Sequence, residues 1–289
     1  MAEKERFDVY KDITRKIVME LAKGEIPWHK RWCSPIKGKM NYVSRRSYGG
    51  VNLLLLPKEG EYLTFKQCSD LGGTIRKGEH TTTVYQYYPY VRPQDKEEFE
   101  RRKKEGLDTD ELTIPVLKYL QVFHLSQVEG IETKITTVDH ESAQSPVDMA
   151  DFCLERLHDT TGIDYREEQT DAIHNDGCLV TLPSRTQFPH EEQWYATLFT
   201  EVAKNVFDRQ MAQKSGEQRK ENAVLDELTC EIASSMVMAS VGLEIKQTQE
   251  DTLAECSRWA EALNKDFRMI VTAATRAQKV AERILQPII

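Results

Sequence analysis

The chain has 289 residues, of which 39% are apolar and 30% are charged, and its formal net charge is −8. This length suits about two domains, and the composition is typical of a globular protein. The longest apolar run, VNLLLLP, is far shorter than the roughly 20 residues that span a bilayer. The charged start MAEKERFD excludes a secretory signal, and six scattered cysteines without a C-x-x-C pair exclude a disulfide framework. We therefore expect a protein of the reducing cytoplasm.

Charge is divided unevenly along the chain. Residues 1–130 carry 23 Lys and Arg against 19 Asp and Glu, a net charge of +4, whereas the remainder carries −12. Such asymmetry indicates an N-terminal half that can bind polyanions and a C-terminal half that does not bind them.

The N-terminal half is predicted to mix helices and strands. A helix over 8–23 follows from Ile13, Ile17 and Leu21 at steps of four, with Asp8 as its N-cap. We next expect a buried run at 51–56, a short helix at 65–71 and a β-branched and aromatic strand at 81–90. A charged insertion at 95–111 and a second strand at 117–130 should follow.

The C-terminal half is predicted to be mostly helical. Residues 131–144 have the composition of a linker, and Ser145 with Pro146 is typical of a helix start. A hairpin is expected near 171–188, a helix over 190–210 with Trp194 on its apolar face, and a long helix ending at Gly242. Two more helices should fill 250–285. The predicted fold class is therefore α+β, with domains at 1–130 and 145–289.

Basic and aromatic residues are interleaved in one acid-free window. Between Glu25 and Glu59 there is no Asp or Glu. The window holds seven Lys or Arg and four Trp or Tyr residues, and R-K-G-E at Arg76–Glu79 adds two cations. Cations attract phosphates without regard to sequence, and exposed aromatics stack on unpaired bases. The pattern favours single-stranded nucleic acid, although Trp28 and Trp32 could equally be core residues beside solvated lysines.

Four motifs here resemble one known family. FDVYKDITRKIVMELAKGEIPWHKRW, SYGGVNLLLL, YLTFKQCSDLGGTIRKGE and VFHLSQVEGI occur in the order and spacing of the N-terminal domain of ArdC-type antirestriction proteins. The resemblance implies a non-specific single-stranded DNA-binding domain carried by plasmids or phages. The expected contact residues are Trp28, Lys30, Arg31, Trp32, Arg45, Arg46, Tyr48, Asn52, Arg76 and Lys77.

The resemblance extends through the second half, where the family carries a zincin-type metallopeptidase domain. Its H-E-x-x-H helix falls on Thr200–Lys204, and its E-E-L-x-A-E helix falls on Asp226–Glu231. Zinc needs the two histidine nitrogens, while the intervening Glu takes a proton from the metal-bound water. Here Glu201, Glu227 and Glu231 remain, but Thr200 is a poor ligand and the Lys204 ammonium has no lone pair. We therefore expect no catalytic metal, no cofactor and no enzymatic activity.

Lys204 suggests a sharper hypothesis. Carboxylates left without a metal are costly when buried, so the Lys204 ammonium could replace the metal charge and pair with Glu227 or Glu231. Alternatively, Lys204 reaches solvent and the glutamates are ordinary surface residues.

The sequence as a whole predicts an antirestriction protein of a mobile element. It would bind single-stranded DNA and carry a catalytically inactive zincin-like domain, which contacts a host defence protein or a second copy. Two alternatives remain open: an inhibitor that binds only protein, and a residual hydrolase that uses Glu201.

Overall fold

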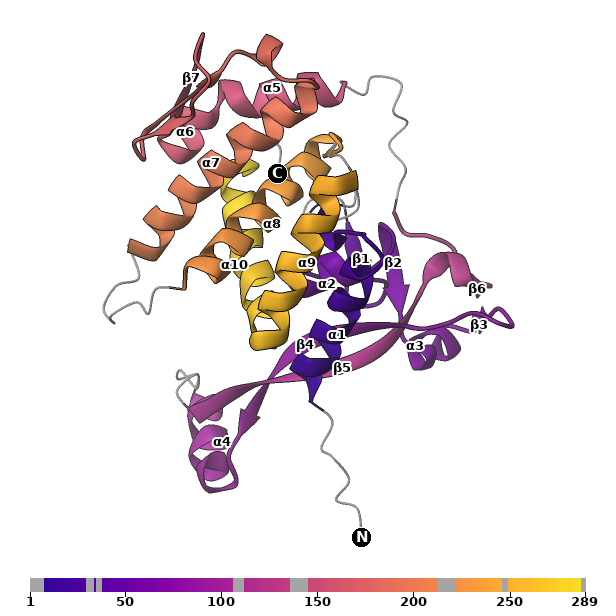
Figure 1. Ribbon diagram of the computed structural model, residues 1–289. Helices are drawn as coiled ribbons and strands as arrows, with labels where there is room; N and C mark the ends of the chain where they lie inside the picture. The colour runs from indigo at the N-terminus through magenta and orange to yellow at the C-terminus, as the bar shows by residue number, and fades with distance from the viewer. Residues whose placement is uncertain are drawn as a thin grey trace.

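The computed structural model describes residues 8–29, 34, 38–105, 112–135, 145–212, 222–245 and 249–286. A region built around a small sheet comes first and a mostly helical region follows (Figure 1). The predicted fold class, α+β with a zincin-like helical second half, is confirmed.

The N-terminal region begins with the predicted helix. The Asp8 carboxylate accepts hydrogen bonds from the amides of Tyr10 and Lys11, which would otherwise lack partners at the helix start. The Thr64 hydroxyl caps a second helix through a reciprocal bond with Gln67. The elements are α1 (Val9–Leu21), η1 (Pro27–His29), β1 (Lys39–Asn41), α2 (Val51–Leu55), β2 (Gly60–Leu63), α3 (Phe65–Asp70) and β3 (Thr74–Ile75).

A long antiparallel ribbon dominates this region. The strands β4 (Thr82–Val91) and β5 (Thr113–His124) pair along their whole length, and the sheet order is β1-β2-β5-β4. Between them lie η3 (Pro93–Asp95) and α4 (Lys96–Glu105), at the far end of the ribbon (Figure 1). The predicted charged insertion is thus partly helical, held by ion pairs such as Glu98 with Arg101 and Arg102. After η5 (Leu125–Gln127), β6 (Val128–Glu129) pairs with β3.

The C-terminal region packs helices beside a three-stranded sheet. Ser145 caps its first helix, and Gly242 ends the long α8 in a left-handed conformation, as predicted. The short strands pair in the order β7-β9-β8, and β8 with β9 forms the predicted hairpin. The elements are α5 (Pro146–Glu155), α6 (Leu157–Thr161), β7 (Asp164–Glu168), β8 (His174–Asn175), β9 (Leu179–Pro183), η6 (Arg185–Gln187), α7 (Glu191–Ala212), α8 (Ala223–Val241), α9 (Gln249–Lys265) and α10 (Met269–Ile284).

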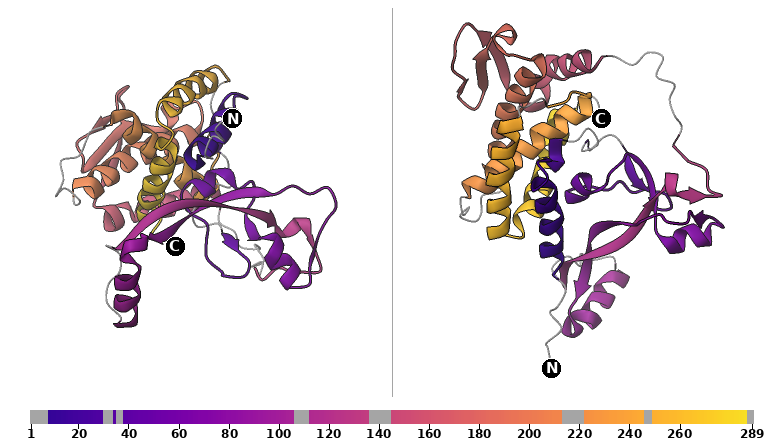
Figure 2. Two further views of the ribbon diagram at one scale, coloured as in Figure 1. Left: turned by 90° about the horizontal axis from the view of Figure 1, so that it is seen from below. Right: turned by 45° about the vertical axis from the view of Figure 1, so that its right-hand side comes forward.

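One apolar core runs through both regions. The N-terminal helix α1 lies along α9 and α10 (Figure 2), and Ile13, Ile17 and Trp28 join the same buried cluster as Trp259 and Ala274. The two predicted domains therefore do not have separate cores. Within the described residues, no helix combines the length and apolarity needed to cross a membrane.

Candidate nucleic-acid interface and degenerate metal site

Trp28 is a core residue and does not lie on a binding surface. Its side chain is fully buried, because η1 packs against α8 and the indole meets Trp259 edge-on at 6.3 Å between ring centroids. The prediction that Trp28 stacks on bases is wrong, since a ring without accessible surface cannot contact a ligand. Lys30, Arg31 and Trp32 lie outside the described residues.

Two further predicted contact residues have structural partners. Arg45 donates a hydrogen bond through Nη1 to the carboxylate of Glu61, which is 1% exposed. Asn52 is 6% exposed, and its amide group exchanges bonds of 2.8 and 2.7 Å with the backbone of Tyr85. Asn52 thus attaches α2 to β4 and has little surface left for a ligand.

The remaining four predicted residues lie at two separate places. Arg46 and Tyr48 line one pocket, beside the sheet. Arg76 and Lys77 follow β3, in the separate two-stranded sheet beyond α3 (Figure 1). Arg76 is 3.7 Å from Glu129, and both side chains are at least half exposed, so this ion pair adds little stability.

The β4–β5 ribbon carries an exposed aromatic and basic surface that sequence reasoning missed. Residues directly opposite in an antiparallel pair share a face, so Gln86, Tyr88 and Tyr90 lie with Lys118, Val116 and Ile114. We call these six residues the open ribbon face. Tyr90 is 48% exposed, and the Lys118 ammonium lies 5.3 Å from the centre of the Tyr88 ring. The alternation V-x-Q-x-Y-x-Y predicts a strand whose Gln and Tyr side chains share one face, but the sequence does not show that this face is exposed.

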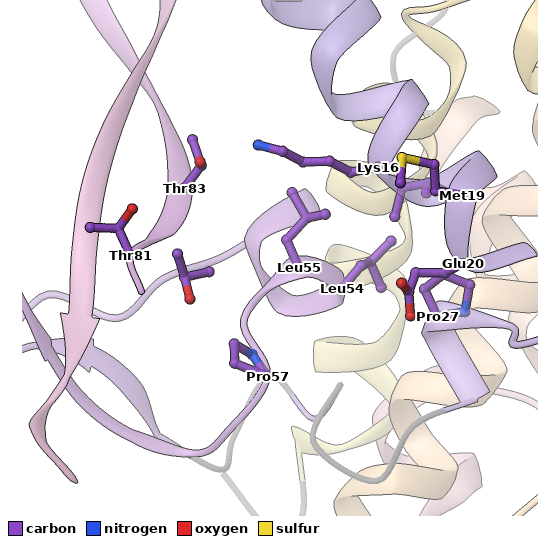
Figure 3. Close-up of a pocket in the computed structure, with 11 residues that line it drawn as sticks. Lys16, Met19, Glu20, Pro27, Leu54, Leu55, Pro57, Thr81 and Thr83 are labelled. Atoms are coloured by element: carbon purple, nitrogen blue, oxygen red, sulfur yellow. The ribbon is translucent and has the colours of Figure 1, made fainter. Parts of the chain in front are cut away.

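The opposite face of the ribbon is turned toward α1. The Tyr85 hydroxyl donates to Asp12 at 2.6 Å and accepts from Lys16 at 2.7 Å. A groove of about 400 Å³ opens between α1, α2 and the start of β4 (Figure 3). Lys16 reaches across it toward the strand, but its ammonium is already bound by Asp12 and Tyr85. This groove is therefore a poor phosphate site.

The helix that should hold zinc lacks the ligands. Thr200 donates its hydroxyl to the carbonyl of Ala196, and Lys204 pairs with Glu201 at 2.5 Å. Glu201 also accepts a bond of 2.9 Å from Asn175. A threonine hydroxyl and an ammonium at the two expected histidine positions do not fit the donor set of a zincin metal.

Lys204 does not pair with the partners that we predicted. Its ammonium contacts Glu201 one turn away and is 47% exposed, whereas Glu227 pairs with Arg258 and Glu231 with His29. The hypothesis of an internal bridge to Glu227 or Glu231 is wrong, because each of these carboxylates has gained another cationic or imidazole partner.

His29, Glu231 and Glu255 form a cluster of possible metal ligands. His29 Nε2 is 2.9 Å from Glu231 Oε1, and ligand atoms of all three residues lie within 4.8 Å of one another. They come from η1, α8 and α9, so both regions of the protein contribute. This is the one such group among the described residues, and it uses neither Thr200 nor Lys204.

Comparison with known families accounts for both halves. The family model for the N-terminal domain of anti-restriction factor ArdC matches residues 7–123, and a zincin-like metallopeptidase model matches residues 153–276. The chain thus contains an ArdC-type N-terminal domain followed by a zincin-like domain.

The relatives differ greatly in length. Two DNA primases TraC of Escherichia coli are each 27% identical to this chain over 96% and 94% of its residues, and the chain spans only 27% and 19% of their lengths. The uncharacterized protein y4eC of Sinorhizobium fredii is 26% identical over 95% of the chain and 91% of its own length.

Solved structures of ArdC from the R388 plasmid resemble the whole chain. The metal-free structure is 26% identical with a TM-score of 0.67, and the Mn(II)-bound structure is 25% identical with a TM-score of 0.70. Both matches cover 97% of this chain and 98% of the other.

Proposed function

We propose that this ArdC-like protein binds single-stranded DNA without sequence preference and protects the DNA of a mobile element from restriction or a related host defence. The second domain keeps the zincin-like fold without peptidase activity and contacts protein, either a host defence factor or a second copy. The proposed setting is the cytoplasm, where incoming DNA meets restriction enzymes.

The open ribbon face is the observation that carries this proposal. Tyr88 and Tyr90 offer rings for stacking, and Lys118 and Arg46 offer charge at the same side of the sheet. Within the described residues, the Arg46 guanidinium has no hydrogen-bond or ion-pair partner. Stacking contributes about 1–3 kcal/mol per base, and unpaired cations add a salt-dependent attraction to phosphate. A duplex hides its base faces, so this combination favours single strands.

The replacement of both expected histidines supports the proposal that the second domain is catalytically inactive. Glu201, which would be the general base, is bound by Lys204 and Asn175. A carboxylate that already binds an ammonium and an amide is a weaker base for a metal-bound water.

Fluorescence anisotropy with a labelled (dT)20 strand and a matched duplex, at 50 and 200 mM salt, tests the proposal. We expect tighter binding of the single strand and weaker binding at the higher salt. Tyr90→Ala should lower the affinity about five- to tenfold. Tyr119→Ala is the matched control, because Tyr119 is similarly exposed at 47% but lies across from Tyr85, on the opposite face of the ribbon.

Three results would count against the proposal. Absence of single-strand binding at 50 mM salt would favour an inhibitor that binds only protein. Equal effects of Tyr90→Ala and Tyr119→Ala would remove the open ribbon face from the interface. Peptidase activity lost in Glu201→Gln would show that the second domain is a hydrolase.

A further inference from the structure

A pocket of about 470 Å³ opens at the end of the open ribbon face, beside β1 and α3. Its volume lies within the usual range for small-ligand sites. The walls come from the turn after β1, from α3 and from both long strands, so a ligand here would touch four parts of the sheet region. The side chains that matter to the argument are Arg46, Tyr48, Gln67, Gln86, Tyr88 and Leu120.

The motif Y-x-G-x-N at residues 48–52 builds this pocket. Tyr48 forms part of the wall and packs edge-on against Tyr62, at 6.0 Å between ring centroids. Gly50 has φ +57° and ψ −133°, a conformation that side-chain-bearing residues rarely adopt, and its amide donates to Gln278 on α10 at 2.6 Å. Asn52 fixes the backbone of Tyr85, next to Gln86, and both Gln86 and Tyr88 line the same pocket as Tyr48. The motif thus joins the pocket to both the ribbon and the helical region.

The chemistry of the walls suits a flat, uncharged ring attached to an anion. None of the described lining residues is acidic, in a chain with 47 Asp and Glu, and Arg46 is the one cation among them. Burial raises the pKa of the Tyr48 hydroxyl, so it remains a neutral donor. Leu120, which is 38% exposed, supplies apolar surface to the same pocket.

We propose that this pocket takes one unstacked nucleobase of the bound strand, with Arg46 on the neighbouring phosphate. The inference rests on the proposed function and adds a defined base subsite to it. Tyr88 belongs both to the pocket wall and to the open ribbon face, so a strand stacked on Tyr90 and Tyr88 leads directly into the pocket. The absence of acidic lining residues leaves the path open to a phosphodiester backbone.

Photocrosslinking of the unaltered protein tests the proposal directly. A (dT)10 strand with 5-iodouracil in place of thymine is irradiated on the protein, and the crosslinked peptides are identified by mass spectrometry. We expect crosslinks in the peptides that contain Tyr48 or Tyr88. Crosslinks confined to other peptides, such as the one with Arg76 and Lys77, would overturn the base pocket while leaving single-strand binding intact.

A comparison of strands with and without bases gives the second test. Tyr48→Ala should weaken (dT)10 about tenfold but change the affinity for a ten-residue abasic strand less than twofold, because only the base is lost from the pocket. Lys77→Ala, outside the pocket, should affect both strands equally. An equal loss for both strands in Tyr48→Ala would overturn the inference. Circular dichroism first confirms that each variant is folded. If neither strand binds the unaltered protein, the proposed function itself fails.

Discussion

Two adjacent arginines have different roles. Arg45 holds the buried carboxylate of Glu61, which also accepts bonds from the Thr133 hydroxyl at 2.8 Å and the Lys134 amide at 2.9 Å. Arg46 is exposed at the pocket beside the ribbon and has no side-chain partner among the described residues. Charge alone could not separate them in the sequence, because the partner of Arg45 is 16 residues away on a paired strand.

Alanine substitution should separate these roles. Arg45→Ala leaves Glu61 buried with one fewer donor, so we expect a loss of about 1–3 kcal/mol in the free energy of unfolding. Arg46→Ala should change that free energy by less than about 0.5 kcal/mol but lower single-strand affinity and reduce the salt dependence. Urea unfolding and anisotropy on the same two variants measure both quantities. A large stability loss in Arg46→Ala would contradict the assignment.

Glu61 should also make stability depend on pH. Burial raises the pKa of this carboxyl, but the bonds from Lys134, Thr133 and Arg45 outweigh burial and lower it below its ordinary value. A pKa lowered on folding contributes stability that is present above the unfolded value, about 4.3, and is lost as pH falls through the folded value. The Glu61→Gln variant should therefore be less stable than the unaltered protein at pH 7. Between about pH 5 and 3 its free energy of unfolding should fall by less than that of the unaltered protein. Melting temperatures across that range test this, and an unchanged slope would contradict it.

At the scale of elements, η1 places the Trp28 ring in the shared core. The segment follows α1 and packs against α8, so Trp28 reaches Trp259 across more than 200 residues of sequence. Indole rings packed edge-to-face contribute both buried area and a favourable electrostatic contact. Through this contact, Pro27 and Trp28 connect the N-terminal region to the helical region.

Trp28→Ala should destabilise the fold without removing the DNA-binding surface. We expect a loss of about 3–5 kcal/mol in unfolding free energy, as for other large-to-small changes in cores. Well below the melting temperature, single-strand affinity should stay within about twofold of the unaltered protein. If Trp28→Ala keeps full stability and loses DNA affinity, the ring contacts DNA after all.

Local signals in the sequence predicted the elements well, whereas long-range contacts were out of reach. The caps at Asp8, Ser145 and Gly242 depend on neighbouring residues, and all three are confirmed. The burial of Trp28 depends on Trp259, far along the chain, and Lys204 pairs with its near neighbour Glu201 and not with the distant Glu227 or Glu231, so both predictions failed. Period-two alternation marked β4 as a strand, but only its register with β5 shows which tyrosines share an exposed face.

At the scale of the whole molecule, the two regions are joined through shared packing. α1 lies along α9, Gly50 bonds to Gln278 on α10, and Trp28 meets Trp259. The base pocket is therefore anchored to the helical region, even though its walls belong to the sheet. The zincin-like domain thus has a structural role here, because it supports the surface that we propose binds DNA.

Restoring histidine at positions 200 and 204 tests the proposal that the second domain binds no catalytic metal. The helix α7, which carries Glu201, packs against α8, which carries Glu227 and Glu231. Replacing Thr200 and Lys204 together by histidine recreates H-E-x-x-H on a helix that already has the zincin surroundings. We expect the double variant to bind Zn²⁺ or Mn²⁺ at one ion per chain, and the unaltered protein to show no binding that depends on Glu201.

Metal analysis and isothermal titration calorimetry measure both proteins. Glu227→Gln in the double variant should weaken binding at least tenfold, since a carboxylate from the later helix completes such sites. His29→Gln in the unaltered protein is the matched control, because His29, Glu231 and Glu255 form the other candidate group in the described part of the chain. The unaltered protein could bind metal in a way that Glu201→Gln abolishes and His29→Gln leaves unchanged. That result would show that α7 still holds a metal despite Thr200 and Lys204. The proposal that the second domain is catalytically inactive would then be wrong, because hydrolysis requires a metal beside Glu201.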